Sequence, residues 1–287
     1  MGKLTVAGIQ MGPYPGSYAA NMDKAVDALE RAVSEYKPDV ICFSEVMTGP
    51  YFCRVYDDAY FNFAEPVPGP TTEIFGAQAR KHKTNVIATM YEEDNGMRYN
   101  TAVLISRDGS LTGKYRKTHV PKSSSPLMNS DEKYYFRPGN ELPVFTMDGI
   151  KVGMLICFDR SFPEPFRVLA VKGAEIVFVP VCTWGLRADA FQAELQVRAV
   201  ENQLFILAVN KAGFEQVEGE DGGRDHFGRS CVVSPMGEIE ASIEGEPWGI
   251  VAATIELDKR KVMKETLVDW MRERRPELYG EITRPKD

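Results

Sequence analysis

LPVFTMDGIKVGMLICFDRSFPE, residues 142–164, is the stretch on which the fold prediction rests. Two apolar runs flank Asp148 and Gly149, and an Asp-Gly pair supplies the positive φ angles that a tight hairpin turn needs. The second run continues into Cys157, and SFPE at 161–164 has the spacing of a helix capping box with proline in the first turn. The stretch therefore predicts a β-hairpin whose second strand ends at a cysteine, followed at once by a helix.

Strand and helix patterns alternate along the rest of the chain, and hairpin signals interrupt them. A second Asp-Gly pair, Asp108 and Gly109, separates the runs NTAVLIS and LTGKYRK. We expect strands at 4–10, 39–43, 85–89, 175–181, 203–209, 231–234 and 249–255, helices over 22–33, 73–83 and 188–202, and a polar loop over 122–133. Hairpins within an alternating chain favour an α/β sandwich of mixed sheets over a purely parallel sheet.

The C-terminal tail, from about residue 258 to 287, is charged and carries Trp270 and Tyr279. Its apolar surface is too small for a core of its own. We expect residues 1–287 to form a single domain whose tail packs on the main body or on a partner subunit.

Composition and charge exclude several classes of protein. The 34 Lys and Arg against 41 Asp and Glu give a net charge of −7, which argues against a nucleic-acid partner. Charged or turn residues interrupt every apolar run before membrane-spanning length, and the first residues lack the long apolar segment of a signal peptide. Five widely spaced cysteines, an odd number, indicate a reducing compartment. We therefore expect a cytoplasmic protein that contacts neither membrane nor nucleic acid.

Three reactive side chains, Glu45, Lys117 and Cys157, stand where predicted strands end, and strand ends are where open α/β sheets build their sites. Each alone has an ordinary explanation as a cap, a solvated charge or a buried thiol. Together they can act on a carbonyl: a buried carboxylate can take the thiol proton, and a lysine can stabilise the oxyanion. The helix predicted after Ser161 would favour the Cys157 thiolate through its dipole.

The histidines do not indicate a metal site or a histidine base. His82 lies inside a predicted exposed helix and His226 in a polar loop, while His119 follows Lys117 by two residues. The sequence has no CxxC, HExxH or paired-histidine cluster. No metal is expected.

Three motifs resemble the carbon-nitrogen hydrolase (nitrilase) superfamily: FSE at 43–45, GKYRKTHVP at 113–121 and LICFDRSFPE at 155–164. The resemblance runs from the first strand to Tyr279 and Gly280. It implies an αββα sandwich with a catalytic triad, a homodimer or larger homo-oligomer, and no cofactor. The triad it implies is Glu45, Lys117 and Cys157.

The resemblance also adds a second catalytic carboxylate, Glu132, in DEKYYFRPG at 131–139. Its implied role is to orient Lys117 and balance its charge, with the incoming amine or water as a further contact. The alternative is a loop carboxylate in water.

Within the superfamily the chain is most similar to N-carbamoyl amidohydrolases, the branch that includes β-ureidopropionase. The similarity rests on CFDR at 157–160, KGAE at 172–175, RAVEN at 198–202 and YG at 279–280. It implies that Arg160 grips a substrate carboxylate, because guanidinium matches a carboxylate bidentately. An internal ion pair with Asp159 or Glu164 is the alternative. Some N-carbamoyl-D-amino-acid hydrolases carry two successive arginines here, whereas this chain has Ser161 after Arg160.

The segment at 182–184 is similar to the part of the family that lines the acyl pocket. The resemblance makes Trp184 a wall and puts the backbone N–H of Phe158 beside the oxyanion. Asn210 and the glycine-rich loop 218–228 are candidates for the rim. The substrate-binding residues are expected to be Phe158, Arg160, Cys182, Thr183, Trp184 and His119.

The sequence therefore predicts a cysteine-dependent hydrolase of small linear amides. The favoured substrate is an N-carbamoyl amino acid, cleaved to the amino acid, CO2 and ammonia. An aliphatic amidase or nitrilase with the same triad is the enzymatic alternative, and a noncatalytic ligand-binding scaffold is the alternative of another class. The expected partners are a small amide or ureido compound and further copies of the chain.

Overall fold

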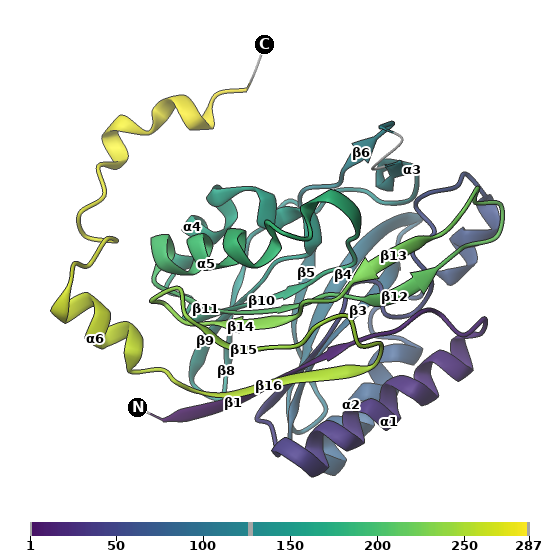
Figure 1. Ribbon diagram of the computed structural model, residues 1–287, viewed down its shortest axis with the longest axis horizontal. Helices are drawn as coiled ribbons and strands as arrows, with labels where there is room; N and C mark the ends of the chain where they lie inside the picture. Colours follow the sequence, from purple (N-terminus) through teal and green to yellow (C-terminus); the bar gives the residue numbers. More distant parts are fainter. Residues whose placement is uncertain (1, 126–128, 286–287) are drawn as a thin grey trace.

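Two six-stranded sheets pack face to face at the centre of the molecule (Figure 1). The computed structural model describes residues 2–125 and 129–285, so 126–128 of the predicted polar loop lie outside the described residues. Helices cover the outer faces of both sheets (Figure 1). This arrangement confirms the predicted αββα sandwich.

The first sheet is parallel at its centre and antiparallel toward its edges. In spatial order it contains β16 (Gly249–Glu256), β1 (Lys3–Gln10), β2 (Val40–Phe43), β3 (Asn85–Asp94), β4 (Met97–Ile105) and β5 (Leu111–Arg116). The β4–β5 hairpin turns at the predicted Asp108 and Gly109, and Gly109 has the positive φ of 83° that the turn requires.

The second sheet has parallel strands in the middle and a predicted hairpin at one edge. It contains, in spatial order, β15 (Ile239–Ser242), β14 (Cys231–Val233), β11 (Phe205–Val209), β10 (Ile176–Pro180), β9 (Ile150–Met154) and β8 (Val144–Met147). Asp148 and Gly149, both with positive φ, join β8 to β9. The hairpin is therefore confirmed, and β9 runs toward Cys157.

Two helices lie on each outer face (Figure 1). α1 (Tyr18–Tyr36) and α2 (Pro70–His82) cover the first sheet, and α4 (Pro163–Val171) and α5 (Phe191–Asn202) cover the second. α1 buries Met22 and Leu29 of the predicted apolar face, and Ser17 caps it by accepting a hydrogen bond from the Ala20 N–H. The remaining helices are α3 (Glu132–Tyr135), α6 (Lys259–Thr266) and 3₁₀ turns at Asp58–Phe63, Cys157–Ser161, Gly185–Arg187, Pro276–Leu278 and Gly280–Thr283.

The predicted capping box at 161–164 is wrong. Phe162, not Ser161, precedes the first turn of α4, and no side chain caps it. Ser161 ends a 3₁₀ turn, and its Oγ accepts a hydrogen bond of 2.7 Å from Arg187. A side chain already bound to a distant arginine is not available to its own helix.

Two short ribbons complete the fold: β6 (Lys122–Ser123) with β7 (Ser130–Asp131), and β12 (Ala212–Glu215) with β13 (Arg224–Phe227). His226, expected in a polar loop, lies on β13 and is buried. Main-chain pairing with β12 and a ring contact with Trp184 place this histidine inside the molecule.

The C-terminal tail leaves the sandwich after β16 and extends beside it as an arm (Figure 1). α6 is anchored by Arg260, whose guanidinium donates to the carbonyls of Gln203 and Ala174. Beyond α6, Leu278 and Ile282 are 64% and 65% exposed. Within residues 2–125 and 129–285, no helix is both long enough and apolar enough to cross a membrane.

Candidate active site

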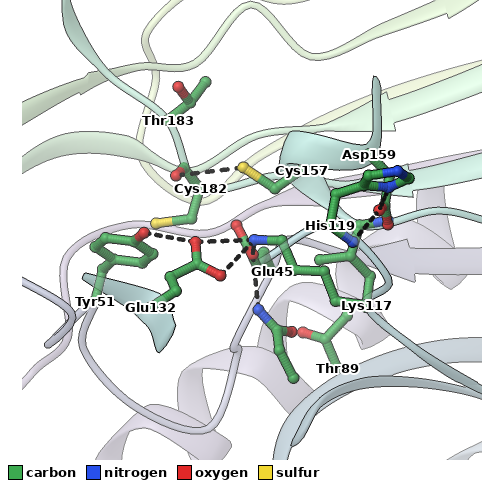
Figure 2. A network of polar contacts seen from close by, with 12 residues as sticks. Glu45, Tyr51, Thr89, Lys117, His119, Glu132, Cys157, Asp159, Cys182 and Thr183 are labelled. Atoms are coloured by element: carbon green, nitrogen blue, oxygen red, sulfur yellow. Dashed lines mark hydrogen bonds and ion pairs between the residues drawn. The ribbon is translucent and has the colours of Figure 1, made fainter. Parts of the chain in front are cut away.

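The three side chains predicted to act together come from the ends of three different strands (Figure 2). Glu45 follows β2, Lys117 follows β5 directly, and Cys157 follows β9. The Lys117 ammonium donates 2.7 Å to Glu45 Oε1 and 2.6 Å to Glu132 Oε2. Cys157 lies beside this group, with its sulfur directed to the Cys182 carbonyl (Figure 2). The structure therefore brings the predicted triad and Glu132 together.

Lys117 is fully buried, and its charge is held by two carboxylates. Burial by itself would lower the pKa of Lys117, but attraction to Glu132 and Glu45 outweighs burial and raises this pKa well above its usual value. Burial raises the pKa of Glu132 to about 7, although Lys117 acts in the opposite direction. The site therefore holds a permanent ammonium and one carboxyl that titrates near neutral pH.

Cys157 is a protonated thiol at rest. Burial, followed by the nearby Glu45 charge, raises the pKa of this thiol to about 12, although Lys117 and Arg160 lower it. The helix predicted after Ser161 is present as α4 from Pro163, but burial is the largest influence on this thiol and keeps it protonated. The Sγ–H points to the Cys182 carbonyl oxygen at 3.8 Å. The thiol therefore needs a base to become a nucleophile.

Glu45 lies in the same group and has one carboxylate oxygen without a partner among the described residues. Its Oε1 accepts hydrogen bonds from Lys117 and, at 2.8 Å, from the Asn100 amide. Its Oε2 is buried and has no hydrogen-bond partner among the described residues. One oxygen is thus fixed in place, and the other is available for a proton.

The turns that carry Cys157 and Glu45 store backbone strain. Cys157 has a φ of 45°, and Val46, directly after Glu45, has a φ of 46°. The left-handed region costs a non-glycine residue on the order of 1–3 kcal/mol, and for a β-branched valine it is an outlier. Packing around these turns holds the chain in its sharp bends, with the Glu45 and Cys157 side chains near each other (Figure 2).

A cavity of about 440 Å³ opens above Cys157. Its wall includes five of the six residues expected to bind substrate: Phe158, Arg160, Cys182, Thr183 and Trp184. Asn210 holds this wall from behind, since its side chain accepts from the Thr183 N–H at 2.9 Å and donates to the Gly228 carbonyl. The glycine-rich loop 218–228 is absent from the described lining, so its expected place at the rim is not observed.

His119, the sixth expected substrate residue, does not line this cavity. Its ring Nδ1 lies 2.8 Å from Asp159 Oδ1, and its ring stacks on Phe162 with centroids 4.0 Å apart. It borders a separate depression with Leu142 and Pro143 instead. His119 therefore helps to hold the loop after Lys117 against the Cys157–Ser161 turn, and the expectation of a substrate contact is wrong.

Arg160 belongs to the Cys157–Ser161 turn and is buried. Its Nη1 donates to the Cys157 carbonyl at 2.9 Å and lies 3.7 Å from Sγ. Its Nε is 3.3 Å from Glu194, so neither of the expected ion-pair partners, Asp159 and Glu164, is used. This geometry favours the ion-pair interpretation over a carboxylate grip, with a partner contributed by α5.

Sequence reasoning missed two residues that touch the catalytic carboxylates. Tyr51 lines the cavity and donates its hydroxyl to Glu132 at 2.7 Å. Asn100, on β4, donates to Glu45. Tyr51 lies between predicted elements and Asn100 begins a predicted hairpin strand, so neither position carried a local signal.

The donor set in the described residues does not suggest a metal. Within residues 2–125 and 129–285, no group of three or more His, Cys, Asp or Glu side chains is arranged to hold a metal ion. The polar groups of the site instead suit a small carbonyl compound: a thiol, a base, an ammonium and a half-enclosed cavity.

This fold and this site define an amide-type hydrolase, and the comparisons specify its family. The chain belongs to the carbon-nitrogen hydrolase family, whose profile matches residues 5–265. It is thus a hydrolase of carbon-nitrogen bonds other than peptide bonds.

Three proteins illustrate what the chain is similar to, and two of them are named for different substrates. The N-carbamoylputrescine amidase of Solanum lycopersicum is 32% identical over 96% of this chain and 93% of its own length. The citrullinase of Francisella tularensis subsp. tularensis is 30% identical over 99% of both chains. The crystal structure of a carbon-nitrogen hydrolase from Helicobacter pylori G27 matches with a TM-score of 0.92 at 27% identity, covering 100% of both chains.

Proposed function

We propose that this protein hydrolyses small linear ureido compounds, with N-carbamoyl amino acids as the preferred substrates. The observation that carries the proposal is the Lys117 ammonium, bound by Glu45 and Glu132 beside the Cys157 thiol on the cavity wall. The names of the relatives favour a ureido substrate, because N-carbamoylputrescine and citrulline both carry a ureido group.

The proposed reaction begins with proton transfer from Cys157 to the free oxygen of Glu45. The sulfur attacks the ureido carbonyl, and the oxyanion is stabilised by the Lys117 ammonium and the Phe158 N–H. Glu45 returns the proton to the departing nitrogen, so ammonia leaves and an N-substituted carbamoyl thioester remains on Cys157. Thiol, base and oxyanion donors act in one buried group, as nucleophilic catalysis requires.

Water completes the proposed cycle. Glu45 removes a proton from water, the hydroxide attacks the thioester carbonyl, and the Cys157 thiol is released with that proton. The product carbamate decomposes to CO2 and the free amine. Glu132 orients Lys117 throughout, and Arg160 positions the nucleophile turn through the Cys157 carbonyl.

Product analysis tests the proposal. The purified protein is incubated with N-carbamoyl-β-alanine, N-carbamoyl-D- and L-amino acids, simple aliphatic amides and nitriles, and ammonia, CO2, amine and acid are measured. We expect ammonia, CO2 and amine in equal amounts, with the highest kcat/KM on the ureido compounds. Higher kcat/KM on amides or nitriles would establish the amidase or nitrilase alternative instead. Binding without turnover on the whole panel would establish the scaffold.

We also propose that the chain forms a homodimer or larger homo-oligomer in a reducing, cytoplasmic setting. The exposed apolar side chains of the tail support the first part, because covering them with a neighbouring subunit removes apolar surface from water. Five free thiols, one of them the proposed nucleophile, support the second.

A further inference from the structure

The wall of the active-site cavity carries more positive than negative charge. Four lining residues are cations, Lys122, Lys133, Arg160 and Arg187, whereas the described lining contains one carboxylate, Glu132. That carboxylate is engaged by Lys117 inside the site. A substrate entering the cavity therefore meets a cationic surface.

Three of the four lining cations are held by other residues. Lys122 lies 2.6 Å from Asp131 Oδ2. Arg160 and Arg187 share the single carboxylate of Glu194, at 3.3 and 2.7 Å. Two guanidinium groups on one carboxylate leave a net positive charge at this side of the cavity.

Lys133 differs from the other three. Among the described residues it has no hydrogen-bond or ion-pair partner, and its side chain is exposed at the cavity wall. It follows Glu132 directly on α3, so its backbone is fixed relative to the Lys117–Glu132 pair. Among the described residues, the lining cation without a partner thus stands on the same short helix as Glu132, which binds Lys117.

We propose that Lys133 binds the carboxylate of the substrate and makes the enzyme prefer anionic ureido compounds; this inference rests on the proposed function. A substrate whose ureido carbon lies at Cys157 presents its far end to the cavity wall. A substrate carboxylate at that end can form a charge-assisted hydrogen bond with Lys133. It does not have to displace a partner of Lys133 among the described residues. A terminal amine, as in N-carbamoylputrescine, is repelled by the same wall.

Steady-state kinetics on three ureido compounds test the inference: N-carbamoyl-β-alanine as the anion, propylurea as the neutral compound and N-carbamoylputrescine as the cation. We expect the parent to rank them in that order by kcat/KM. Lys133→Gln lowers the ratio of kcat/KM for the anion over propylurea by about tenfold, mainly through KM, and Lys133→Arg restores most of it. Lys133→Glu moves the preference toward the cation.

The matched control is Lys3→Gln, which removes one positive charge from β1, where Lys3 pairs with Glu256. It retains the parental ratio. An anion-to-neutral ratio that stays the same in Lys133→Gln overturns the inference while ureido hydrolysis, and with it the proposed function, stands. A parent that hydrolyses none of the three compounds overturns both.

Discussion

Glu45 and Glu132 share one ammonium but differ in surroundings. Glu45 accepts hydrogen bonds from Lys117 and Asn100, whereas Glu132 accepts them from Lys117 and the Tyr51 hydroxyl. Burial raises the pKa of Glu132 to about 7, so this carboxyl is protonated below that pH and ionised above it. When Glu132 is protonated, Lys117 pairs more tightly with Glu45, and Glu45 becomes a weaker base.

We therefore expect kcat/KM to rise with pH through an inflection near 7. Glu132→Gln removes the titrating group, so the inflection should disappear and activity at about pH 8 should fall by at least about 100-fold. A pH profile of kcat/KM for both proteins measures this. An inflection that persists in Glu132→Gln would assign it to another group.

At the residue scale, motifs located the catalytic group because Glu45, Lys117 and Cys157 each stand at a strand end within a distinctive sequence. Contacts between side chains that are distant in sequence could not be predicted from these motifs. Arg160 directly follows Asp159 in sequence, yet its ion-pair partner Glu194 comes from α5. No local spacing predicts such a pair.

At the element scale, Asp159 joins the lysine loop to the nucleophile turn. It is fully buried and accepts from the Ile156 N–H at 2.8 Å, from the Tyr115 hydroxyl at 2.6 Å and from the His119 N–H at 2.9 Å. The carboxylate thus fixes the distance between the loops that carry Lys117 and Cys157.

Asp159→Asn should lower the free energy of unfolding by about 3 kcal/mol, because an amide cannot accept all of these hydrogen bonds and the lost charge-assisted ones are each worth about 1.5–3 kcal/mol. Urea denaturation measures the change. Asp148→Asn is the matched control: Asp148 is a partly exposed turn residue paired with Arg107, and its loss should change stability by about 1 kcal/mol or less. Equal effects of the two substitutions would refute the joining role of Asp159.

Element positions were largely predictable, because apolar periodicity and the two Asp-Gly turns are local signals. The errors arose where distant contacts override such signals. Ser161 has cap spacing but binds Arg187, and His226 has polar neighbours in sequence but is buried against Trp184.

At the scale of the whole molecule, strand order was not predictable, because β16 pairs with β1 across nearly the full length of the chain. The position of the C-terminal tail relative to the sandwich was likewise not predictable from the sequence. Its apolar residues lie on an arm beside the sandwich (Figure 1), which is why an oligomer is proposed.

Light scattering tests the oligomer. We expect the parent to have at least twice the mass of one chain, and the double variant Leu278→Glu with Ile282→Glu to shift toward the monomer, because charged side chains disfavour a buried apolar contact. Both residues are exposed, so the unfolding midpoint of the isolated chain should change little. A parent that is monomeric at all concentrations would remove the proposal.

The most direct test of the central claim, that Cys157 is the nucleophile of the Glu45–Lys117 site, is the rate of ammonia release from N-carbamoyl-β-alanine by Cys157→Ala beside the parent. We expect a loss of at least about 10⁴-fold. Urea denaturation should show the variant still folded, because the substitution removes one sulfur from the cavity wall. Hydrolysis by the folded variant at the rate of the parent would contradict the account.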